Sequence, residues 1–302
     1  MIRVFMPIAV TFTVVYAGVC IALFCYQRSL IYFPQQASFG NSTSTSSIHV
    51  PGADLVSSVR PVSGPYALIY FGGNAEDVSI NLPEFSVTFP EHSLFLMHYR
   101  GYGGSSGSPT EEALHADALA LFDKVHGEHS SIVVIGRSLG TGVAVRLASE
   151  RPVSRLVLVT PYCSLMELAE QQFPYIPVRW LLEDKFESWR YAPQVTAPTT
   201  IVIAENDEVV PTESSNLLFS SFRKGIATSV VIAAAGHNTV SASRAYLPAL
   251  AHVRLMKPVV HKTTMDTSRA CCAGLPFRSL QPLMLYDEPR PDASFCGRCM
   301  HE

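Results

Sequence analysis

The chain has 302 residues, 48% of them hydrophobic, and a formal net charge of −3 at pH 7. This length allows one large α/β domain, with or without appendages, whose core is big enough to be stable alone. A charge so close to neutral, without a basic stripe in the sequence, argues against a nucleic-acid partner.

The first segment of the chain predicts a membrane anchor. Residues 4–27, between Arg3 and Arg28, carry no charge and are mostly Val, Ile, Phe, Leu, Ala and Met. As a helix this segment is about 35 Å long, enough to cross a hydrocarbon core of about 30 Å. We therefore predict a single-pass membrane protein anchored by residues 1–29. The positions of the two arginines slightly favour an extracytoplasmic body, which is periplasmic if the source is bacterial.

A cleaved signal peptide or a lipoprotein signal is the alternative interpretation of this segment. Its apolar run is longer than the core of a usual signal peptide, and no small-x-small cleavage site follows it. Val19 and Phe24, which precede Cys20 and Cys25, are poor matches to a lipoprotein cleavage site. These observations favour an anchor that is retained.

A domain of alternating strands and helices is predicted over residues 30–256. It begins with residues 34–48, which are rich in Ser, Thr, Asn, Gln and Gly, as expected of a tether or an entry loop. Short apolar runs then alternate with helical patterns, which indicates a doubly wound α/β fold with a mostly parallel sheet covered on both faces. The predicted strands are 67–71, 93–98, 132–135, 156–160, 200–204 and 229–232.

One helix of this domain has clear end signals. Ser108 is the predicted N-cap, with Pro109 at the first helical position and Glu111 at the third. An apolar face at helical spacing follows, and Gly127 is expected to end the helix.

Residues 162–192 interrupt the alternation with an apolar, aromatic segment that contains both tryptophans, Trp180 and Trp189. A helical insertion after a strand is expected to act as a lid over a pocket at the C-terminal edge of the sheet. A pair of ordinary packing helices is an equally good interpretation, because aromatic clusters commonly form core.

The last segment, residues 257–302, loses the periodic pattern and is predicted to be a poorly ordered tail. With His261 or His301, its cysteines offer zinc ligands, but adjacent cysteines are not the usual second half of a zinc site. We therefore expect no metal and no cofactor. The tail holds four of the seven cysteines, namely Cys271, Cys272, Cys296 and Cys299.

The middle of the chain carries a candidate nucleophile. Four β-forming residues, 132–135, lead into Gly136-Arg137-Ser138-Leu139-Gly140, and a run of small residues follows. This Gly-x-Ser-x-Gly pattern is typical of the nucleophile elbow, a sharp strand-to-helix turn that exposes one serine hydroxyl. Gly136 and Gly140 are expected there because a Cβ at either position would crowd the backbone. Gly142 and Ala144 are expected to let the next helix pack close to the sheet.

A base and an acid follow the serine in the order found in doubly wound hydrolases. Asp207 comes just after the predicted strand 200–204, and His237 follows the last strand in Ala235-Gly236-His237-Asn238. Serine is a weak nucleophile near neutral pH, so it needs a base in reach and a group that orients this base. Glu205 and Glu208 are alternatives to Asp207, which fits the loop best.

The developing oxyanion would need backbone donors. One is the amide of Leu139, the residue after the serine, and the other is expected in the loop after an earlier strand. Gly72-Gly73-Asn74 follows strand 67–71, so Asn74 is the predicted second donor.

These motifs together resemble the membrane-anchored branch of the α/β-hydrolase superfamily. The resemblance covers about residues 28–255 and rests on five motifs. They are Phe71-Gly72-Gly73-Asn74-Ala75-Glu76-Asp77, Tyr99-Arg100-Gly101-Tyr102-Gly103, the Ser138 elbow, residues 207–211 and the His237 loop. That branch includes animal protein palmitoyl-thioesterases and many bacterial proteins labelled as serine-aminopeptidase-like hydrolases. The resemblance implies Ser138 as nucleophile, His237 as general base and Asp207 as its orienting acid. Family members often have His-Gly-Asn where this chain has Gly72-Gly73-Asn74.

The sequence therefore predicts a membrane-anchored serine hydrolase that cleaves ester or thioester bonds of a small-molecule or lipid-like acyl substrate. Two alternatives remain. One is a serine peptidase of the aminopeptidase-like kind, which acts on amides. The other is a catalytically silent hydrolase-fold module that binds a ligand at the membrane.

Overall fold

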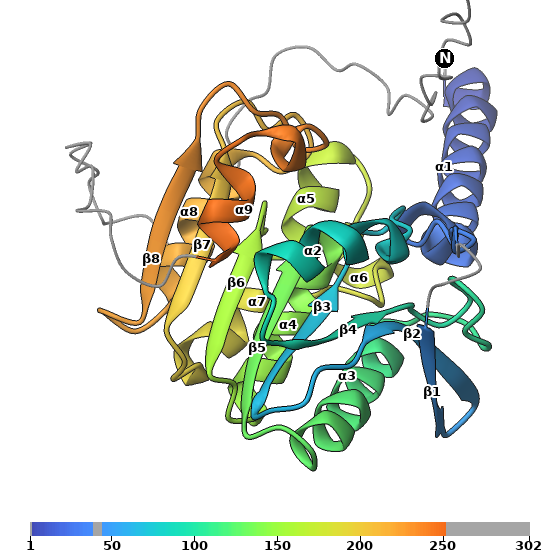
Figure 1. Cartoon of the computed structure of the whole chain (residues 1–302). Coiled ribbons are helices and arrows are strands. Elements are labelled where there is room, and N and C mark those ends of the chain that lie inside the picture. The colour runs from blue at the N-terminus through green and yellow to red at the C-terminus, as the bar shows by residue number, and fades with distance from the viewer. Residues whose placement is uncertain (1, 39–43, 252–302) are drawn as a thin grey trace, which may run out of the picture. The chain divides into compact units, whose positions relative to one another are not determined.

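The computed structural model describes residues 2–38 and 44–251 (Figure 1). Its centre is an eight-stranded sheet in the order β1-β2-β4-β3-β5-β6-β7-β8. β1 and β2 pair antiparallel, as do β2 and β4, and every other pairing is parallel. The strands are β1 (Ser44–Val50), β2 (Ala53–Arg60), β3 (Tyr66–Phe71), β4 (Ser93–Met97), β5 (Ser131–Arg137), β6 (Arg155–Val159), β7 (Thr199–Ala204) and β8 (Ala227–Ile232).

Helices cover both faces of the sheet, and each face has its own apolar core (Figure 1). One face packs against α3 (Glu111–His126), α4 (Leu139–Glu150) and α8 (Thr212–Ser221). The other packs against α2 (Leu82–Thr88) and α9 (Tyr246–Ala251). The doubly wound, mostly parallel α/β fold predicted from the sequence is confirmed, and each of the six predicted strands corresponds to one of β3–β8.

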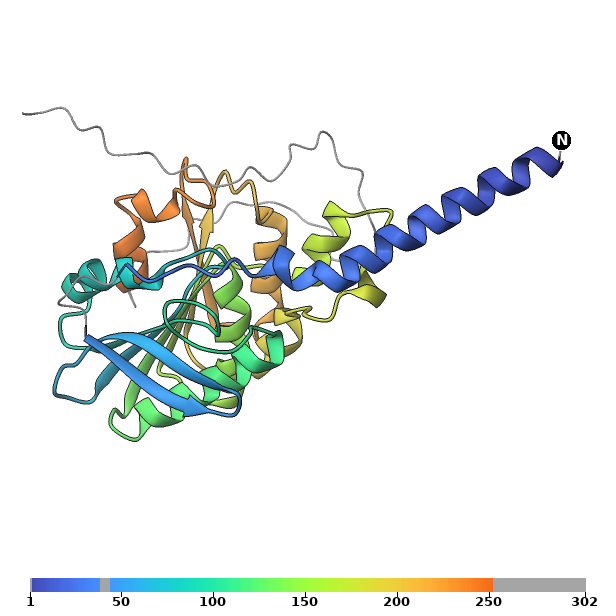
Figure 2. The same cartoon turned by 90° about the vertical axis from the view of Figure 1, so that its right-hand side faces the viewer.

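The antiparallel hairpin β1–β2 was not predicted (Figure 2, broad blue strands). β1 reads Ser-Thr-Ser-Ser-Ile-His-Val and is mostly exposed, so it lacks the apolar run by which the buried strands are recognised. Residues 44–48 therefore belong to a strand and not to a tether. β2 alternates between buried and more exposed positions and joins this hairpin to β4.

Helix α3 begins later than predicted. Its N-cap is Thr110, whose side chain accepts a hydrogen bond from the amide of Ala113. The predicted N-cap, Ser108, lies outside the helix. Glu111 opens the helix, and its carboxylate accepts the amides of Lys185 and Phe186 at 2.7 and 2.9 Å. The helix ends at Gly127 as expected.

The insertion at residues 162–192 forms three short helices, α5 (Leu165–Gln172), α6 (Val178–Leu181) and α7 (Ser188–Tyr191). Its root is core. Tyr162 and Phe186 are buried, and a Cβ on Gly142 would lie 2.6 Å from Tyr162 Oη and 2.9 Å from Phe186 Cδ1. Gly142 thus makes room for the insertion and not for the sheet. The tip is open, because Tyr175 and Trp180 are both 87% exposed. The root of the segment therefore packs as core, and the role of its exposed tip as a lid stays a prediction.

The apolar N-terminal segment forms a long helix, α1 (Ile2–Ile31). Its window of highest hydropathy is entirely unburied, and residues 6–31 are long and apolar enough to cross a membrane. Along one stripe of the helix Cys20 and Leu23 are half-buried and Gln27 is buried. Tyr16 lies on the same stripe, and its hydroxyl donates to Tyr175 O of the insertion at 2.8 Å. The predicted tail, residues 257–302, lies outside the described residues.

Candidate active site

The loops that carry the predicted site residues all leave the carboxyl edge of the parallel sheet. β3 lies next to β5, and the chain reaches β4 on one side of β3 before it returns to β5 on the other. Such a switch in strand order opens a crevice outside the carboxyl ends of the two strands, where ligands bind in open α/β sheets. The loop after β3 and the turn after β5 meet at this place.

Ser138 occupies the turn between β5 and α4 with a strained backbone, φ 48° and ψ −116°. Non-glycine residues seldom have positive φ, and such strain is concentrated at functional sites. The turn is tight because its neighbours are small. A Cβ on Gly136 would lie 2.5 Å from Gly140 O and 2.8 Å from Ala144 Cβ, and a Cβ on Gly140 would collide with the carbonyl of Phe71. Local sterics thus account for both glycines of the motif.

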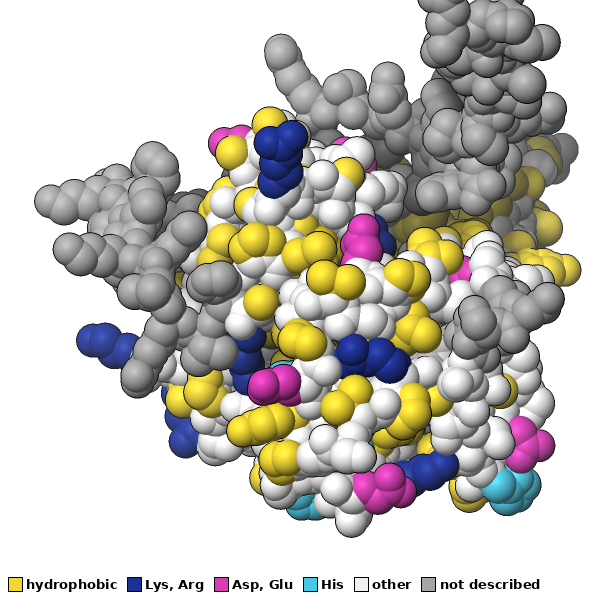
Figure 3. All heavy atoms as spheres, viewed as in Figure 1, with side chains coloured by type: hydrophobic (Ala, Val, Ile, Leu, Met, Phe, Trp, Pro, Cys, Tyr) yellow, Lys and Arg dark blue, Asp and Glu magenta, His cyan; other side chains and the backbone are white. Residues whose placement is uncertain are grey.

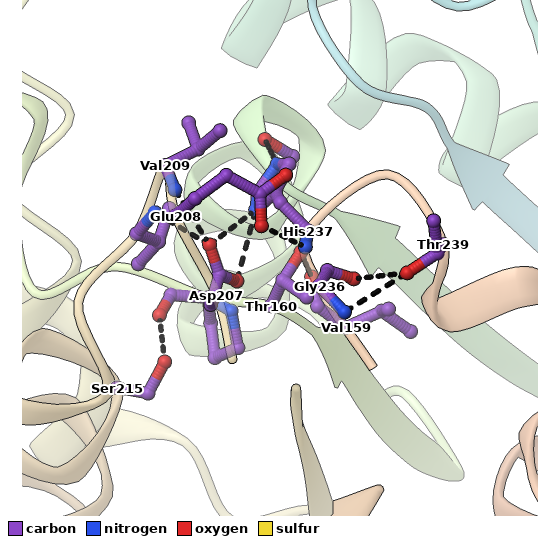
Figure 4. A network of polar contacts seen from close by, with 12 residues as sticks. Val159, Thr160, Asp207, Glu208, Val209, Ser215, Gly236, His237 and Thr239 are labelled. Carbon is purple, nitrogen blue, oxygen red and sulfur yellow. Dashed lines mark hydrogen bonds and ion pairs between the residues drawn. The ribbon is translucent and has the colours of Figure 1, made fainter. Parts of the chain in front are cut away.

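The three predicted polar residues lie in one chain of contacts. Ser138 Oγ lies 2.9 Å from His237 Nε2. His237 Nδ1 lies 2.9 and 3.0 Å from the two carboxylate oxygens of Asp207 (Figure 4). Asp207 Oδ1 also accepts the amides of Val209 and Val210 at 3.0 and 2.7 Å. His237 is 5% exposed and the Asp207 side chain 2%. With a carboxylate at Nδ1, the network assigns the ring proton to Nδ1 and leaves Nε2 as an acceptor facing the serine hydroxyl.

The two alternative acids contact the backbone and not the imidazole. Glu205 Oε2 accepts the amide of Ala234 at 2.8 Å. Glu208 Oε2 accepts the amide of His237 at 3.0 Å, and a Cβ on Gly236 would lie only 2.5 Å from this oxygen. Glu208 therefore holds the loop that presents the histidine, whereas Asp207 holds its ring.

The loop after β3 lies against the serine. A Cβ on Gly73 would be 3.7 Å from Ser138 Cβ, and Gly140 N donates to Gly72 O at 3.1 Å. Among the described residues, the amides of Asn74 and Leu139 have no recorded protein acceptor. We call residues 72–77 the oxyanion loop, after the role proposed for it below.

Two tyrosines that sequence reasoning did not single out hold this loop. Tyr99 Oη donates to Gly72 O at 2.8 Å, and Tyr102 Oη donates to Asn74 O at 2.7 Å. Both are buried, and burial raises the pKa of each phenol, so both remain protonated donors. They belong to the Tyr-Arg-Gly-Tyr-Gly motif, which in the sequence supports only the family resemblance and has no role assigned to it. A signal was present, since two tyrosines in a glycine-rich turn after a buried strand are available to reach a neighbouring loop.

Glu76 fixes the same loop from within. Its carboxylate accepts Gly73 N, Tyr70 Oη and Asn81 Nδ2, each at 2.7 Å, and lies 3.4 Å from Arg137 Nη1. Burial lowers the pKa of Arg137, but Glu76, Tyr70 and Tyr246 together raise it by more, so the guanidinium remains charged. A buried carboxylate that meets four donors in this way stiffens the backbone it contacts.

Within residues 2–38 and 44–251, no cluster of three or more His, Cys, Asp or Glu side chains has the arrangement of a metal site. The cysteine and histidine residues considered for zinc in the tail lie outside this part of the chain.

Comparisons with known proteins agree with the architecture. A family model described as the alpha/beta hydrolase fold matches residues 67–188, a span that includes Ser138 and ends before Asp207. An uncharacterized protein of Mycobacterium tuberculosis is 32% identical over 283 residues, which cover 87% of this chain and 96% of that protein. Alpha/beta hydrolase domain-containing protein 17B of Homo sapiens is 29% identical over 192 residues, 61% of this chain and 65% of that protein.

Solved structures resemble the fold at low identity. An esterase of Pyrococcus furiosus superposes with a TM-score of 0.56 at 18% identity, over 70% of this chain and 92% of that one. Alpha/beta hydrolase domain-containing protein 10 from mouse gives a TM-score of 0.54 at 16% identity, over 69% and 95%.

Proposed function

The chain belongs to the α/β-hydrolase superfamily, and we propose that it is a membrane-anchored serine hydrolase that cleaves carboxylic ester or thioester bonds. The observation that carries the proposal is the line of contacts from Ser138 Oγ through His237 to Asp207, with two backbone amides, of Asn74 and Leu139, that have no acceptor among the described residues. Core packing alone does not require a serine, a histidine and an acid in this order and at these distances.

In the proposed reaction, Ser138 Oγ attacks the acyl carbonyl while His237 Nε2 takes its proton. Asp207 holds the proton on Nδ1 and stabilises the imidazolium that forms. The tetrahedral oxyanion accepts hydrogen bonds from the amides of Asn74 and Leu139. His237 then protonates the leaving alcohol or thiol, and water, activated by the same nitrogen, releases the acyl group from Ser138.

The proposed substrate is a lipid-like acyl compound or a small acyl ester. Its support is the apolar helix α1, long enough to cross a membrane, beside an insertion whose Tyr175 and Trp180 are almost fully exposed. Exposed Tyr and Trp are typical of the interface between membrane and water. The insertion is then a lid at the carboxyl edge of the sheet, and the body is extracytoplasmic if Arg3 marks the inner side.

Labelling with a fluorophosphonate tests the proposal, because such probes react with an activated serine. We expect the full-length protein in detergent to be labelled at Ser138 and to hydrolyse acyl esters. Ser138→Ala should lose both, since loss of the nucleophile costs on the order of 10⁶ in a well-studied serine protease. Folded wild-type protein without Ser138 labelling would favour the silent binding module, and hydrolysis by Ser138→Ala at the wild-type rate would exclude this serine as nucleophile.

A substrate panel narrows the leaving group. Acyl esters, acyl thioesters and aminoacyl amides of equal acyl length should be compared by kcat/KM on the same preparation. We expect esters and thioesters to exceed amides. The reverse order would identify the protein as an amide hydrolase of the aminopeptidase-like kind.

A further inference from the structure

The last residue of α1, Ile31, and the extended segment 32–38 after it join the helix to the body and run along the loops of the candidate site. We name residues 31–38 the strap, visible in Figure 2 as the blue coil that leads from α1 toward α2. Its far end is hydrogen-bonded to the loop after β4 and to the oxyanion loop. Gln35 O accepts the amide of Gly103 at 2.9 Å, and Ser38 N donates to Asp77 Oδ2 at 2.6 Å.

The near end of the strap is tied to the oxyanion loop through one residue. Phe33 N donates to Asn74 O at 3.1 Å, and Asn74 Nδ2 donates to Ile31 O at 3.2 Å. Tyr102 Oη donates to the same Asn74 carbonyl at 2.7 Å. The backbone carbonyl and the side-chain NH₂ group of Asn74 are therefore both held, and two of these three bonds come from the strap.

The start of the strap is fixed to the root of the insertion by Asp184, whose side chain is 6% exposed. Asp184 Oδ2 accepts from Tyr32 Oη at 3.0 Å and lies 3.3 Å from Arg28 Nε, and Oδ1 accepts Glu111 N at 3.1 Å. Burial and the charge of Asp184 raise the pKa of Tyr32, so the phenol remains a donor. The end of α1, the insertion and α3 meet at this one carboxylate.

We propose that the strap is a positioning element for catalysis: by holding Asn74, it aims the Asn74 amide at the oxyanion and joins the anchor helix to the reaction centre. The inference rests on the proposed function. An oxyanion donor acts only when it lies about 2.7–3.1 Å from the oxygen that develops charge, so a small rotation of the loop weakens it. Without the strap, Tyr102 alone holds the Asn74 carbonyl.

A matched pair of substitutions at Phe33 tests the proposal. The side chain is 41% exposed, so its loss costs little packing. Phe33→Ala keeps the N–H that donates to Asn74, whereas Phe33→Pro removes it. Because Phe33 precedes Pro34, its backbone already favours the extended region that proline adopts.

Both variants should be made in the full chain and assayed in detergent with a soluble p-nitrophenyl ester. We expect Phe33→Ala to match the wild type. Phe33→Pro should lower kcat about tenfold or more with KM within about twofold, because outright loss of one oxyanion donor costs ~10²–10³ and displacement costs less. A merely structural strap would lower the melting temperature but leave the kcat of the folded enzyme unchanged, which would overturn the proposal.

Asn74→Ala provides a second test if Phe33→Pro does not fold. It keeps the backbone amide and removes the bond to Ile31, so kcat should fall with KM unchanged. Unchanged kcat in folded Asn74→Ala would contradict the proposal. In a double mutant the two losses should be less than additive, because both act on the same residue. Ester hydrolysis by the wild type that is lost in Ser138→Ala establishes the proposed function independently of the strap. If the proposed function fails, the wild type shows no such hydrolysis, whereas if only the role of the strap fails, hydrolysis is present and the strap variants keep the wild-type kcat.

Discussion

At the scale of single residues, Asp207 accepts from three donors, an imidazole N–H and two backbone amides. Asp207→Asn replaces one acceptor with a donor and favours the wrong imidazole tautomer. In a well-studied serine protease the corresponding change lowers kcat by ~10⁴, and we expect a loss of ~10²–10⁴ here. Steady-state ester hydrolysis, with circular dichroism to check folding, measures it. The matched control is Glu205→Gln, whose carboxylate contacts only the Ala234 amide in the described structure. An equal loss in both variants would contradict the role of Asp207.

The glycine at position 72 has a steric explanation. A Cβ there would lie 2.5 Å from Val78 Cγ1 and 3.1 Å from Glu76 Oε2. We expect Gly72→Ala to destabilise the protein by about 1–3 kcal/mol, the usual cost of overpacking. Thermal unfolding in detergent measures this loss. Adding Val78→Ala should cost less in the Gly72→Ala background than in the wild type, since it removes the clash. Strictly additive losses would show that Val78 is not the obstacle.

At the scale of elements, the buried strands and the order of the site residues could be predicted, because both are local patterns. The runs that became β3–β8 are apolar and short, and Ser138, Asp207 and His237 each follow a strand. The hairpin β1–β2 could not be predicted, because its stability comes from pairing with β4 and its own sequence is polar. The N-cap of α3, Thr110, could not be predicted because a distant contact decides it. Glu111 binds the backbone of the insertion and does not form a capping box with Ser108.

The oxyanion loop shows the same limit more clearly. Its glycines identify it in the sequence, but besides its own Glu76 it is supported from two other places: the turn that holds Tyr99 and Tyr102, and the strap. No spacing rule links residues 31–33 to Asn74. Only residues 34–38 of the strap lie in the predicted tether, whose polar composition gives no sign of the hydrogen bonds that hold the strap.

The junction of β2 and the loop after β4 predicts a pH dependence. Burial lowers the pKa of His98, which lies 2.9 Å from Ser58 Oγ of β2, to about 4. Between pH 6.5 and 4 the unfolded chain binds a proton at this histidine and the folded chain does not, so stability falls as the pH falls through this window. The shift corresponds to about 3 kcal/mol at most. His98→Gln should reduce the slope of melting temperature against pH between 4 and 6.5. An unchanged slope would mean that other groups govern it.

At the scale of the whole molecule, the surface of helix α1 suits a lipid environment, whereas the surface of the body suits water. The helix exposes an apolar surface, whereas the face of the body in Figure 3 has interspersed charges of both signs. We expect the protein to stay with the membrane pellet after extraction at alkaline pH and to keep its N-terminal residues, as mass spectrometry of the purified chain would show. Release into the supernatant, or a mature chain that starts near residue 28, would identify a cleaved signal instead.

The stripe on α1 that contacts the insertion, from Tyr16 to Gln27, fixes which side of the helix faces the body. Tyr16 and Gln27 are eleven residues apart, close to three full turns, so both face the same way and the stripe is in register with Tyr175 at one end and Leu181 at the other. One residue added between them would turn Tyr16 by about 100° and shift it by about 1.5 Å, while Arg28 and Asp184 stay paired. The number of residues between Tyr16 and Gln27 therefore decides whether both side chains face the insertion. Insertions or deletions of three or four residues, about one helical turn, return Tyr16 to that face.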